Sequence, residues 1–458
     1  MTSIRKTTIM ALAGLTGLSL LAACGSSSSA GGKDATGPVK ITVAIDSGLQ
    51  PDAIKVFDAQ IAQFEQKYPD ISVTHQEYTW TAPTFAARLA GGTLPTVFTT
   101  AFTDGRALIA RRQVADISSE VAKLPYAAKF NKNVVAEGQD QAGKIDMVPI
   151  SAYGQALHYN RALFKAAGLN PDQPPTTWDE IKADAKQISD KTHQAGYAVM
   201  TTGNTGGWIL STESYALGGR MTQAAGDKQT ATVNNPATQQ ALQMYHDMRW
   251  NDKSMGQNFA YDWNGINQAF AAGKIGMYIT GGGTYTNLVT QNNIKPADYG
   301  LTVIPLQGAG AGVLGGGTLA GVSAKATKAQ QAAAVKWIDF YYMQKLTTQA
   351  GALLDAKTLT QQKFPVGAPL LPVFDKATYD QVQVWIKDYI NVPLNQMTSY
   401  TTNEFTQPLV PEPPVATQDV YHSLDSVVQS VLTDKNANIA DLLTKANTKV
   451  QSILDKNS

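Results

Sequence analysis

The chain has little cysteine, little histidine and few charges for its length of 458 residues. Cys24 is the only cysteine, which excludes an internal disulfide and a cysteine-based metal site. The histidines form none of the close pairs that bind zinc; they are His75, His158, His193, His246 and His422. Only 16% of residues are charged, the net charge is +1, and no dense Lys/Arg stripe occurs, which argues against nucleic-acid binding. We expect no metal, no cofactor and no nucleic-acid partner.

Nucleotide and hydrolase motifs are missing or incomplete. No G-x-S-x-G segment occurs, so the sequence offers no nucleophile elbow. Residues 310–315 satisfy G-x-G-x-x-G, but residues 316–322 are typical of a loop and a strand, whereas a dinucleotide site needs a helix there. His75 and Glu77 form an H-x-E fragment without paired cysteines, and we interpret it as the surface of a strand.

The first 24 residues have the layout of a secretory signal. Two basic residues precede an apolar run over 9–23, which is shorter than the about 20 residues of a membrane-spanning helix. The run ends in Leu21-Ala22-Ala23-Cys24-Gly25, which resembles a bacterial lipobox and predicts that Cys24 carries a lipid. The alternative is an ordinary signal peptide with an incidental cysteine. Residues 25–38 are rich in Gly and Ser and predict a flexible tether.

The rest of the chain has the composition of a folded α/β protein. An apolar fraction of 43% is enough for a core, and more than 400 residues predict at least two domains. Residues 39–45 predict a strand, and Ile54, Phe57, Ile61 and Phe64 recur at helical spacing before Tyr68-Pro69-Asp70. A strand at 71–78, a helix at 85–90 and a strand at 96–100 follow. This alternation indicates a parallel sheet with helices on its faces.

Later segments continue the α/β pattern. Thr177 and Glu180 form a T-x-x-E capping box before a helix with an apolar face of Trp178, Ile181, Ala185 and Ile188. Strands are predicted at 144–150, 275–280 and 301–305. The last third is mostly helical, with Pro-rich interruptions at 408–414 and a final apolar stripe of Ile439, Leu442, Leu443, Ala446, Val450 and Ile453.

Several of these segments together resemble the family 1 extracellular solute-binding proteins of bacterial importers, which include maltose-binding protein. The most specific are the Y-N-x-x-L-F-x-x-A-G segment over 159–168 and the P-T-T-W-D-E segment over 175–180. The A-G-G-T-L-P segment over 90–95, the G-K-I-D-M-V-P segment over 143–149 and the F-A-A-G-K-I-G-M segment over 270–277 also match, although Thr96 stands where the family has Asp.

The resemblance implies a type II periplasmic-binding-protein-like fold, with a ligand cleft between two lobes and closure by hinge motion. It implies lobe 1 over 39–150 plus 281–323 and lobe 2 over 151–280 plus 324–458. It further implies a monomeric, non-enzymatic lipoprotein on the outer face of the cell membrane. Such a protein captures a sugar and delivers it to the permease of an ABC-type importer.

A sugar site needs aromatic platforms and polar side chains at the strand ends that face the cleft. In the first lobe these ends carry Asp46, Ser47, Tyr78, Trp80, Thr100, Thr103 and Asp104. Thr100 stands where maltose-binding relatives have an aromatic residue, which implies a different subsite. For Asp46 and Asp104, a helix N-cap or a solvated loop is an equally good interpretation.

The crossing segment and the second lobe supply the other candidates, which are Tyr153, Trp208, Tyr215, Asp262, Trp263, Gly281, Gly283 and Tyr285. Tyr153 stands where relatives often have a ligand-binding Glu. Gly283 stands where many relatives have Trp, so either Tyr285 replaces that platform or the subsite is empty. A core position is the alternative for each aromatic residue, and the stronger one for Tyr215.

Two other functional classes fit the same sequence. A secreted glycosidase needs two carboxylates on one glycosidic bond, and no local arrangement singles out such a pair. A ligand-sensing lipoprotein that couples to a receptor has the same expected fold. Asp46, Asp104 and Asp262 together also suit an amino sugar or another cation.

Overall fold

The computed structural model describes residues 37–225, 228–403 and 406–457. The predicted signal segment, Cys24 and nearly all of the tether lie outside these residues. Residues 38–458 form one unit by their internal contacts. Of the described helices, none is both long and apolar enough to span a bilayer.

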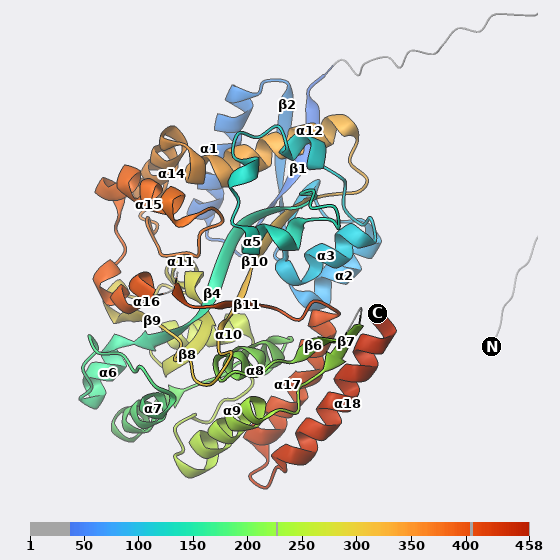
Figure 1. The fold of residues 1–458 in the computed structure, drawn as a ribbon. Helices are drawn as coiled ribbons and strands as arrows, with labels where there is room; N and C mark the ends of the chain where they lie inside the picture. Colours follow the sequence, from blue (N-terminus) through green and yellow to red (C-terminus); the bar gives the residue numbers. More distant parts are fainter. Residues whose placement is uncertain (1–36, 226–227, 404–405, 458) are drawn as a thin grey trace, which may run out of the picture. The chain divides into compact units, whose positions relative to one another are not determined.

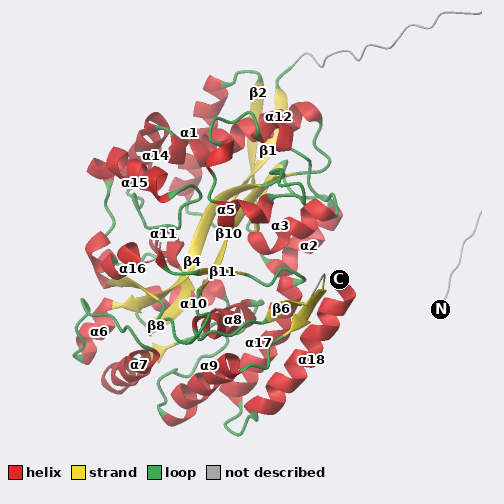
Figure 2. Ribbon diagram, in the orientation of Figure 1, coloured by secondary structure: helices red, strands yellow, loops and turns green. Residues whose placement is uncertain are grey.

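A sheet of nine described strands runs through this unit, in the order β2-β1-β3-β10-β4-β8-β5, with β11 beside β10 and β9 beside β4. Figure 2 shows these strands in yellow, surrounded by helices. Their bounds are β1 (Val39–Ile45), β2 (Ile71–Glu77), β3 (Val97–Ala101), β4 (Val148–Asn160), β5 (Ala195–Tyr197), β8 (Ile275–Gly281), β9 (Tyr299–Val303), β10 (Val313–Val322) and β11 (Leu409–Pro411); β6 (Thr222–Ala225) and β7 (Lys228–Ala231) form a separate hairpin.

The N-terminal elements follow the predicted order. β1 pairs in parallel with β2 and β3, and α1 (Pro51–Lys67) buries Phe57, Ile61 and Phe64 as the helical spacing predicts. α2 (Ala82–Gly91) ends at Gly92, which has a φ of +63° and accepts the left-handed conformation that a helix end favours. The prediction of a parallel α/β start is therefore confirmed.

The sheet becomes mixed at β10, which runs antiparallel to both β3 and β4. The predicted start of the strand at 144–150 is wrong, because residues 140–144 form a turn. In this turn the Asp140 carboxylate accepts hydrogen bonds from the backbone N–H groups of Ala142 and Lys144. Gly143 takes a φ of +78° in that turn. β4 begins only at Val148 and continues to Asn160, well beyond the predicted segment.

The capped helix appears as predicted. α7 (Trp178–Thr192) begins with a complete capping box of Thr177 and Glu180 and buries Trp178, Ile181, Ala185 and Ile188. The strand predicted at 275–280 corresponds to β8, and the strand predicted at 301–305 corresponds to β9, which begins and ends two residues earlier. The remaining longer helices are α3 (Phe102–Ala110), α6 (Arg161–Ala167), α8 (Thr205–Ala216), α9 (Pro236–His246), α10 (Trp263–Ala271), α11 (Tyr285–Thr290), α12 (Lys328–Ile338), α14 (Gln349–Gln361), α15 (Lys376–Ile386), α16 (Thr398–Asn403), α17 (Thr417–Thr433) and α18 (Ile439–Asn457), and the short ones are α4 (Ser118–Val121), α5 (Lys132–Val135) and α13 (Gln344–Thr347).

Two large hydrophobic cores organise the unit. The first core contains buried residues of β1, β2, β3, α1 and α12, and the second contains those of α7 to α11, β8, β9, α17 and α18. β4 and β10 extend from one core to the other, as Figure 1 shows: Val148 and Leu319 belong to the first core, Leu157 and Leu314 to the second. A small third core lies between α14 and α15.

The cores suggest lobe boundaries that differ from the expected ones. Tyr285, Tyr299 and Leu301 lie in the second core, although residues 281–323 were expected in lobe 1. Trp337 and Ile338 lie in the first core, although residues 324–458 were expected in lobe 2. We propose lobes that follow the two cores, because a lobe that moves as a body must keep its own buried residues together.

Candidate ligand-binding site

A hydrogen-bonded group of Trp80, Thr100 and Asp104 lies next to the first core, against which Trp80 packs. The Asp104 carboxylate, in the first turn of α3, accepts bonds from Trp80 Nε1 at 2.7 Å and from Thr100 Oγ1 at 2.6 Å. Burial raises the pKa of Asp104, and these two hydrogen bonds oppose the rise. The structure therefore brings Trp80, which follows the second predicted strand, together with Thr100 and Asp104, which follow the third.

Tyr153 of β4 lies between two glycines on neighbouring strands. A Cβ atom at Gly281 of β8 would lie 3.1 Å from the Tyr153 ring, and one at Gly316 of β10 would lie 2.5 Å from its hydroxyl. The ring also meets Trp208 of α8 edge to face, with centroids 6.1 Å apart. The two glycines thus leave room for an aromatic ring across the sheet, next to a second aromatic side chain.

Glu412 joins this group and was not identified from the sequence. Its Oε1 accepts a bond from the Tyr421 hydroxyl of α17 at 3.2 Å. Burial is the main cause that raises its pKa to about 8; the negative charges of Glu137 and Asp104 raise it further, while bonds from Tyr421 and Trp208 lower it. Glu412 follows β11, in the Pro-rich segment over 408–414, whose sequence pattern indicates only an interruption between helices. Its local pattern carries no signal, because only the pairing of β11 with β10 places it here.

One hydrogen bond connects the two sides of the site directly. Gln418 of α17 donates from Nε2 to Thr103 Oγ1 of α3 at 2.9 Å, and its Oε1 accepts from Asn204 Nδ2 at 3.1 Å. Thr103 lies beside Asp104 in the chain, whereas α17 packs in the second core. Side chains of both cores are therefore in contact at this point.

The other first-lobe candidates lie beside β1 and β2. Asp46 lies at the surface, where protein atoms packed around its carboxyl partly desolvate it and raise its pKa. Its charge acts on Tyr341 and Tyr342. The Ser47 backbone N–H donates to Thr79 Oγ1 at 2.9 Å. Tyr78 is only 1% exposed and packs in the first core, under the guanidinium of Arg88. Ligand contacts of these residues stay predictions.

Most second-lobe candidates have structural contacts. Tyr215 and Tyr285 are each 2% exposed in the second core, the Asp262 carboxylate caps α10 by accepting from the Gly265 N–H at 2.7 Å, and Trp263 is half-buried against the same core. A Cβ atom at Gly283 would lie 2.4 Å from a methyl group of Leu370. Of the second-lobe set, Trp208 and Gly281 lie against Tyr153, and the roles of the others in binding stay predictions.

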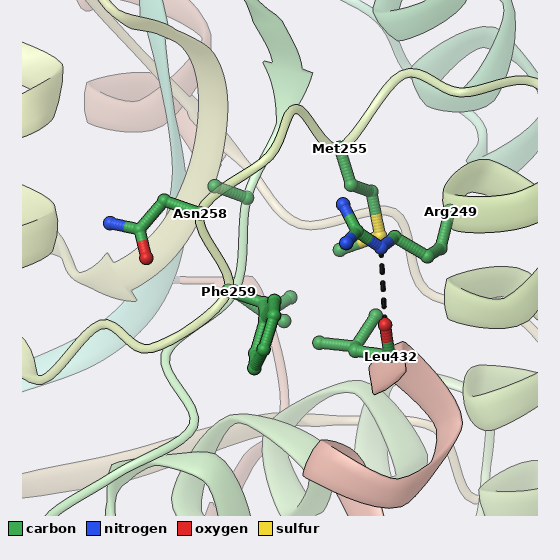
Figure 3. A pocket seen from close by; sticks show the side chains of 7 residues that line it. Arg249, Met255, Asn258, Phe259 and Leu432 are labelled. Carbon is green, nitrogen blue, oxygen red and sulfur yellow. Dashed lines mark hydrogen bonds between the residues drawn. The ribbon is translucent and has the colours of Figure 1, made fainter. Parts of the chain in front are cut away.

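Two pockets lie elsewhere in the described part of the chain, and neither includes a predicted ligand residue. Figure 3 shows the first pocket, which Arg249, Met255 and Phe259 help to line. Arg249 donates from Nε to the Leu432 carbonyl at 3.1 Å, and the pocket leaves no room for a water molecule. The second is an open groove of about 380 Å³ between α7 and α9, lined by residues that include Lys182 and Gln243.

The incomplete motifs have structural explanations. β10 begins at Val313, inside the G-x-G-x-x-G segment, so a strand stands where a nucleotide site needs a helix. His75 lies on β2, at an exposed position, which confirms the prediction that this segment is the surface of a strand. Its Nδ1 lies 2.9 Å from Asp58 Oδ1. Among the described residues, no group of three or more His, Cys, Asp or Glu side chains is placed to hold a metal ion.

Comparisons with known proteins show the family and the fold of this chain. A family model described as bacterial extracellular solute-binding protein matches residues 59–391. A binding protein of Brucella abortus is 27% identical over 173 residues, which are 37% of this chain and 40% of the relative, so the chain matches less than half the length of this relative.

Solved structures match over nearly the whole chain. An ABC transporter solute-binding protein from Thermotoga lettingae TMO, bound with alpha-D-tagatose, has a TM-score of 0.72 at 20% identity and covers 91% of this chain and 100% of its own. Maltose-bound T. maritima MalE3 has a TM-score of 0.70 at 19% identity, with coverage of 91% and 100%. At these identities the likeness shows the fold.

Proposed function

Because the chain belongs to the bacterial extracellular solute-binding protein family, we propose that it captures a carbohydrate between its two lobes and delivers it to an ABC-type importer. The observation that carries the proposal is the hydrogen bond from Gln418 of α17 to Thr103, beside Asp104, which joins the two sides. Trp80 bonds to Asp104 on the first side, and Trp208 bonds to Glu412 on the second. Aromatic faces with carboxylates beside them match the apolar faces and hydroxyl edges of a sugar.

The mechanism follows from where these residues come from. Contacts from both lobes exist together only in a closed form, so a bound solute favours closure by its differential affinity for that form. β4 and β10, which run through both cores, and β11 are the segments that such a hinge would bend. The closed form is what the permease would recognise.

A melting-temperature screen against mono- and oligosaccharides tests this function. A ligand that binds only the folded protein raises its melting temperature, and a binding protein releases no product on incubation. We expect stabilisation without turnover. Product formation from an oligosaccharide would instead favour a glycosidase, for which Glu412 and Asp104 would be the carboxyls to replace.

Alanine variants test the aromatic platforms. Trp208→Ala removes the ring next to Tyr153, and we expect at least a tenfold loss of affinity for the sugar found in the screen, about 1.4 kcal/mol. Trp263→Ala tests the second predicted platform. Trp385→Ala is a matched control, since Trp385 packs against the small third core. Full affinity in both Trp208→Ala and Trp263→Ala would contradict the placement of the platforms.

We further propose that the protein is a lipoprotein, monomeric, and attached to the outer face of the cell membrane through Cys24. Cys24 lies outside the described residues, so support for the anchor comes from the lipobox-like sequence and from membership in an extracellular family. Cys24→Ala should release the protein into the medium, as a cell-fractionation blot would show. Retention of that variant at the membrane would rule out lipid anchoring.

A further inference from the structure

Four side chains form a continuous chain of hydrogen bonds from the surface of α17 to α3. Gln418 Nε2 donates to Thr103 Oγ1 at 2.9 Å, and Gln418 Oε1 accepts from Asn204 Nδ2 at 3.1 Å. Asn204 Oδ1 in turn lies 3.2 Å from His422 Nδ1. Asn204, Gln418 and His422 come from the second-core side, whereas α3 packs in the first core. The bond to Thr103 is therefore the link of this chain that lobe opening would break.

The bonds of Asn204 set the orientation of the Gln418 amide. A side-chain amide has one oxygen, which accepts, and one NH₂ group, which donates. Because Asn204 Nδ2 donates to the Gln418 oxygen, the Gln418 NH₂ group is turned toward Thr103. Asn204 keeps its own orientation through His422, since its oxygen faces the Nδ1 atom of that ring.

Asn204 stands at the N-cap position of α8, but its side chain does not cap the helix. An Asn at this position usually accepts a bond from a backbone N–H group of the first turn. Here the Asp425 carboxylate accepts from the backbone N–H groups of Asn204 and Gly207 instead. The Asn204 backbone has a φ of +70°, a left-handed conformation that Asn adopts more readily than most residues. Since Asp425 caps the helix, the Asn204 amide is available to orient Gln418.

Prior orientation of Gln418 favours the contact between the lobes. Fixing a long side chain costs conformational entropy, and Gln is among the residue types that lose most. α8 and α17 pack in the same core, so the bond between Asn204 and Gln418 persists when the lobes separate. The entropy of Gln418 is then lost before closure rather than during it, which strengthens the bond that closure forms.

We propose that Asn204 is a positioning residue for lobe closure, which holds the Gln418 NH₂ group toward Thr103 and so stabilises the closed form even before a solute binds. The bond to Thr103 requires no solute, because both of its partners belong to the protein. This inference rests on the proposed function, since it assumes two lobes that open and close.

Spin-label distances in the unliganded protein test the proposal. Ala87 of α2 and Lys449 of α18 are exposed and belong to helices of different cores. Ala87→Cys and Lys449→Cys in a Cys24→Ala background carry the labels, and double electron–electron resonance gives the distribution of distances between the lobes. Asn204→Gly removes the amide and keeps the left-handed backbone. We expect it to lower the ratio of closed to open protein about 2- to 10-fold, the effect of one lost hydrogen bond.

A mutant cycle separates positioning from a merely structural role of Asn204 in α8. Thr103→Val removes the acceptor of the bond between the lobes and should shift the distribution in the same direction. Because Asn204 acts on Thr103 through Gln418, the double variant should be no more open than the more open single variant. A structural role of Asn204 would instead add its effect to that of Thr103→Val.

Asn293→Gly is the matched control, because Asn293 also has a positive φ, +55°, at an exposed position outside this chain of hydrogen bonds. It should keep the distribution of the natural protein. An unchanged distribution in Asn204→Gly, or additive shifts in the double variant, would overturn the positioning role. The proposed function would still stand in that case if a sugar raises the melting temperature in the screen, and it fails separately if none does.

Discussion

Single residues in this protein are held in unusual chemical states by the fold. Glu213 of α8 is fully buried in the second core, and its Oε1 accepts a bond from the Tyr197 hydroxyl at 2.6 Å. Burial is the largest cause that raises its pKa to about 8, against an ordinary value of 4.5, while the bond from Tyr197 lowers it. Near neutral pH the folded protein therefore holds a proton on Glu213 that the unfolded chain releases.

Glu213→Gln should change the pH dependence of stability. Because the folded state binds the proton more tightly, Glu213 lowers the free energy of unfolding as pH rises from about 4.5 to about 8, by up to roughly 1.4 kcal/mol per pH unit. In Glu213→Gln this loss should disappear, so the variant gains stability relative to the natural protein between pH 5 and pH 8. Urea unfolding at both pH values measures the difference.

The control for this experiment is Glu77→Gln, which replaces an exposed carboxylate at the end of β2. It should follow the natural protein at both pH values. A Glu213→Gln variant with the same pH slope as the natural protein would show that Glu213 is charged in the fold.

A second residue-scale prediction concerns Gly316. A methyl group there would collide with the Tyr153 hydroxyl, and the ring cannot retreat freely because Gly281 lies close on its other side. Gly316→Ala should therefore displace Tyr153 and weaken sugar binding about tenfold or more, with a stability loss of about 1–3 kcal/mol from overpacking. Titration calorimetry and thermal unfolding measure the two effects.

Gly315→Ala is the matched neighbour on β10. Its added Cβ would meet a methyl group of Leu409 at 3.3 Å rather than the Tyr153 ring. We expect near-normal affinity in this variant. Equal affinities of Gly315→Ala and Gly316→Ala would show that the position of Tyr153 does not matter for the ligand.

At the scale of elements, α17 connects the parts of the site. Asp425 of α17 accepts bonds from the backbone N–H groups of Asn204 and Gly207, at 2.8 Å and 3.0 Å, and so holds the start of α8. The same helix supplies Tyr421 to Glu412 and Gln418 to Thr103. One element thus positions Trp208, orients Glu412 and contacts the first core.

Gln418→Ala should weaken ligand binding through the loss of this contact. The bond from Gln418 to Thr103 connects the two sides of the site, so its loss disfavours the closed form by about 0.5–1.5 kcal/mol and lowers affinity by roughly 2- to 12-fold. Titration of Gln418→Ala, Thr103→Val and the double variant forms a mutant cycle, and the double variant should bind no worse than the weaker single variant.

Gln429→Ala serves as the comparison on the same helix, because Gln429 donates to the Thr201 carbonyl within the second-core side. We expect it to lower stability without lowering affinity. Additive losses in the mutant cycle would mean that Gln418 and Thr103 act separately, against the proposed contact between the lobes.

At the scale of the whole molecule, two cores share strands. β4 carries Val148 in the first core and Leu157 in the second, while β10 carries Leu314 in the second and Leu319 in the first. Unfolding of either core removes strand partners from the other. A hinge made of continuous strands therefore allows the lobes to move as bodies and still couples their stability.

We expect residues 38–458 to unfold in one cooperative transition. In scanning calorimetry the calorimetric and van't Hoff enthalpies should agree, since neither core keeps its sheet without β4 and β10. Two separate transitions, one of them sensitive to ligand and one not, would contradict the coupling through these strands.

The amino-acid sequence by itself determined the local elements. β1 matches its predicted bounds, the capping box and the buried face of α7 match residue by residue, and the family motifs indicate the fold. On α1, Phe57, Ile61 and Phe64 are buried as predicted, whereas Ile54 is half-buried. These features depend on neighbours in the chain, through spacing of apolar residues and through side chains that cap the next turn. Trp80, Thr100, Asp104 and Tyr153 are candidates because each stands near a strand end or crossing that the pattern can show, and Trp208 is one because it is an aromatic residue in a Gly- and Thr-rich segment.

Only the tertiary structure decided how these residues meet. The bonds from Trp80 and Thr100 to Asp104, the space for Tyr153 above Gly281 and Gly316, and the place of Glu412 all depend on strands that pair across long stretches of chain. The membership of α12 in the first core and of β9 in the second depends on the same pairing. No local pattern reports such contacts, because their free energy comes from packing between segments that are distant in the sequence.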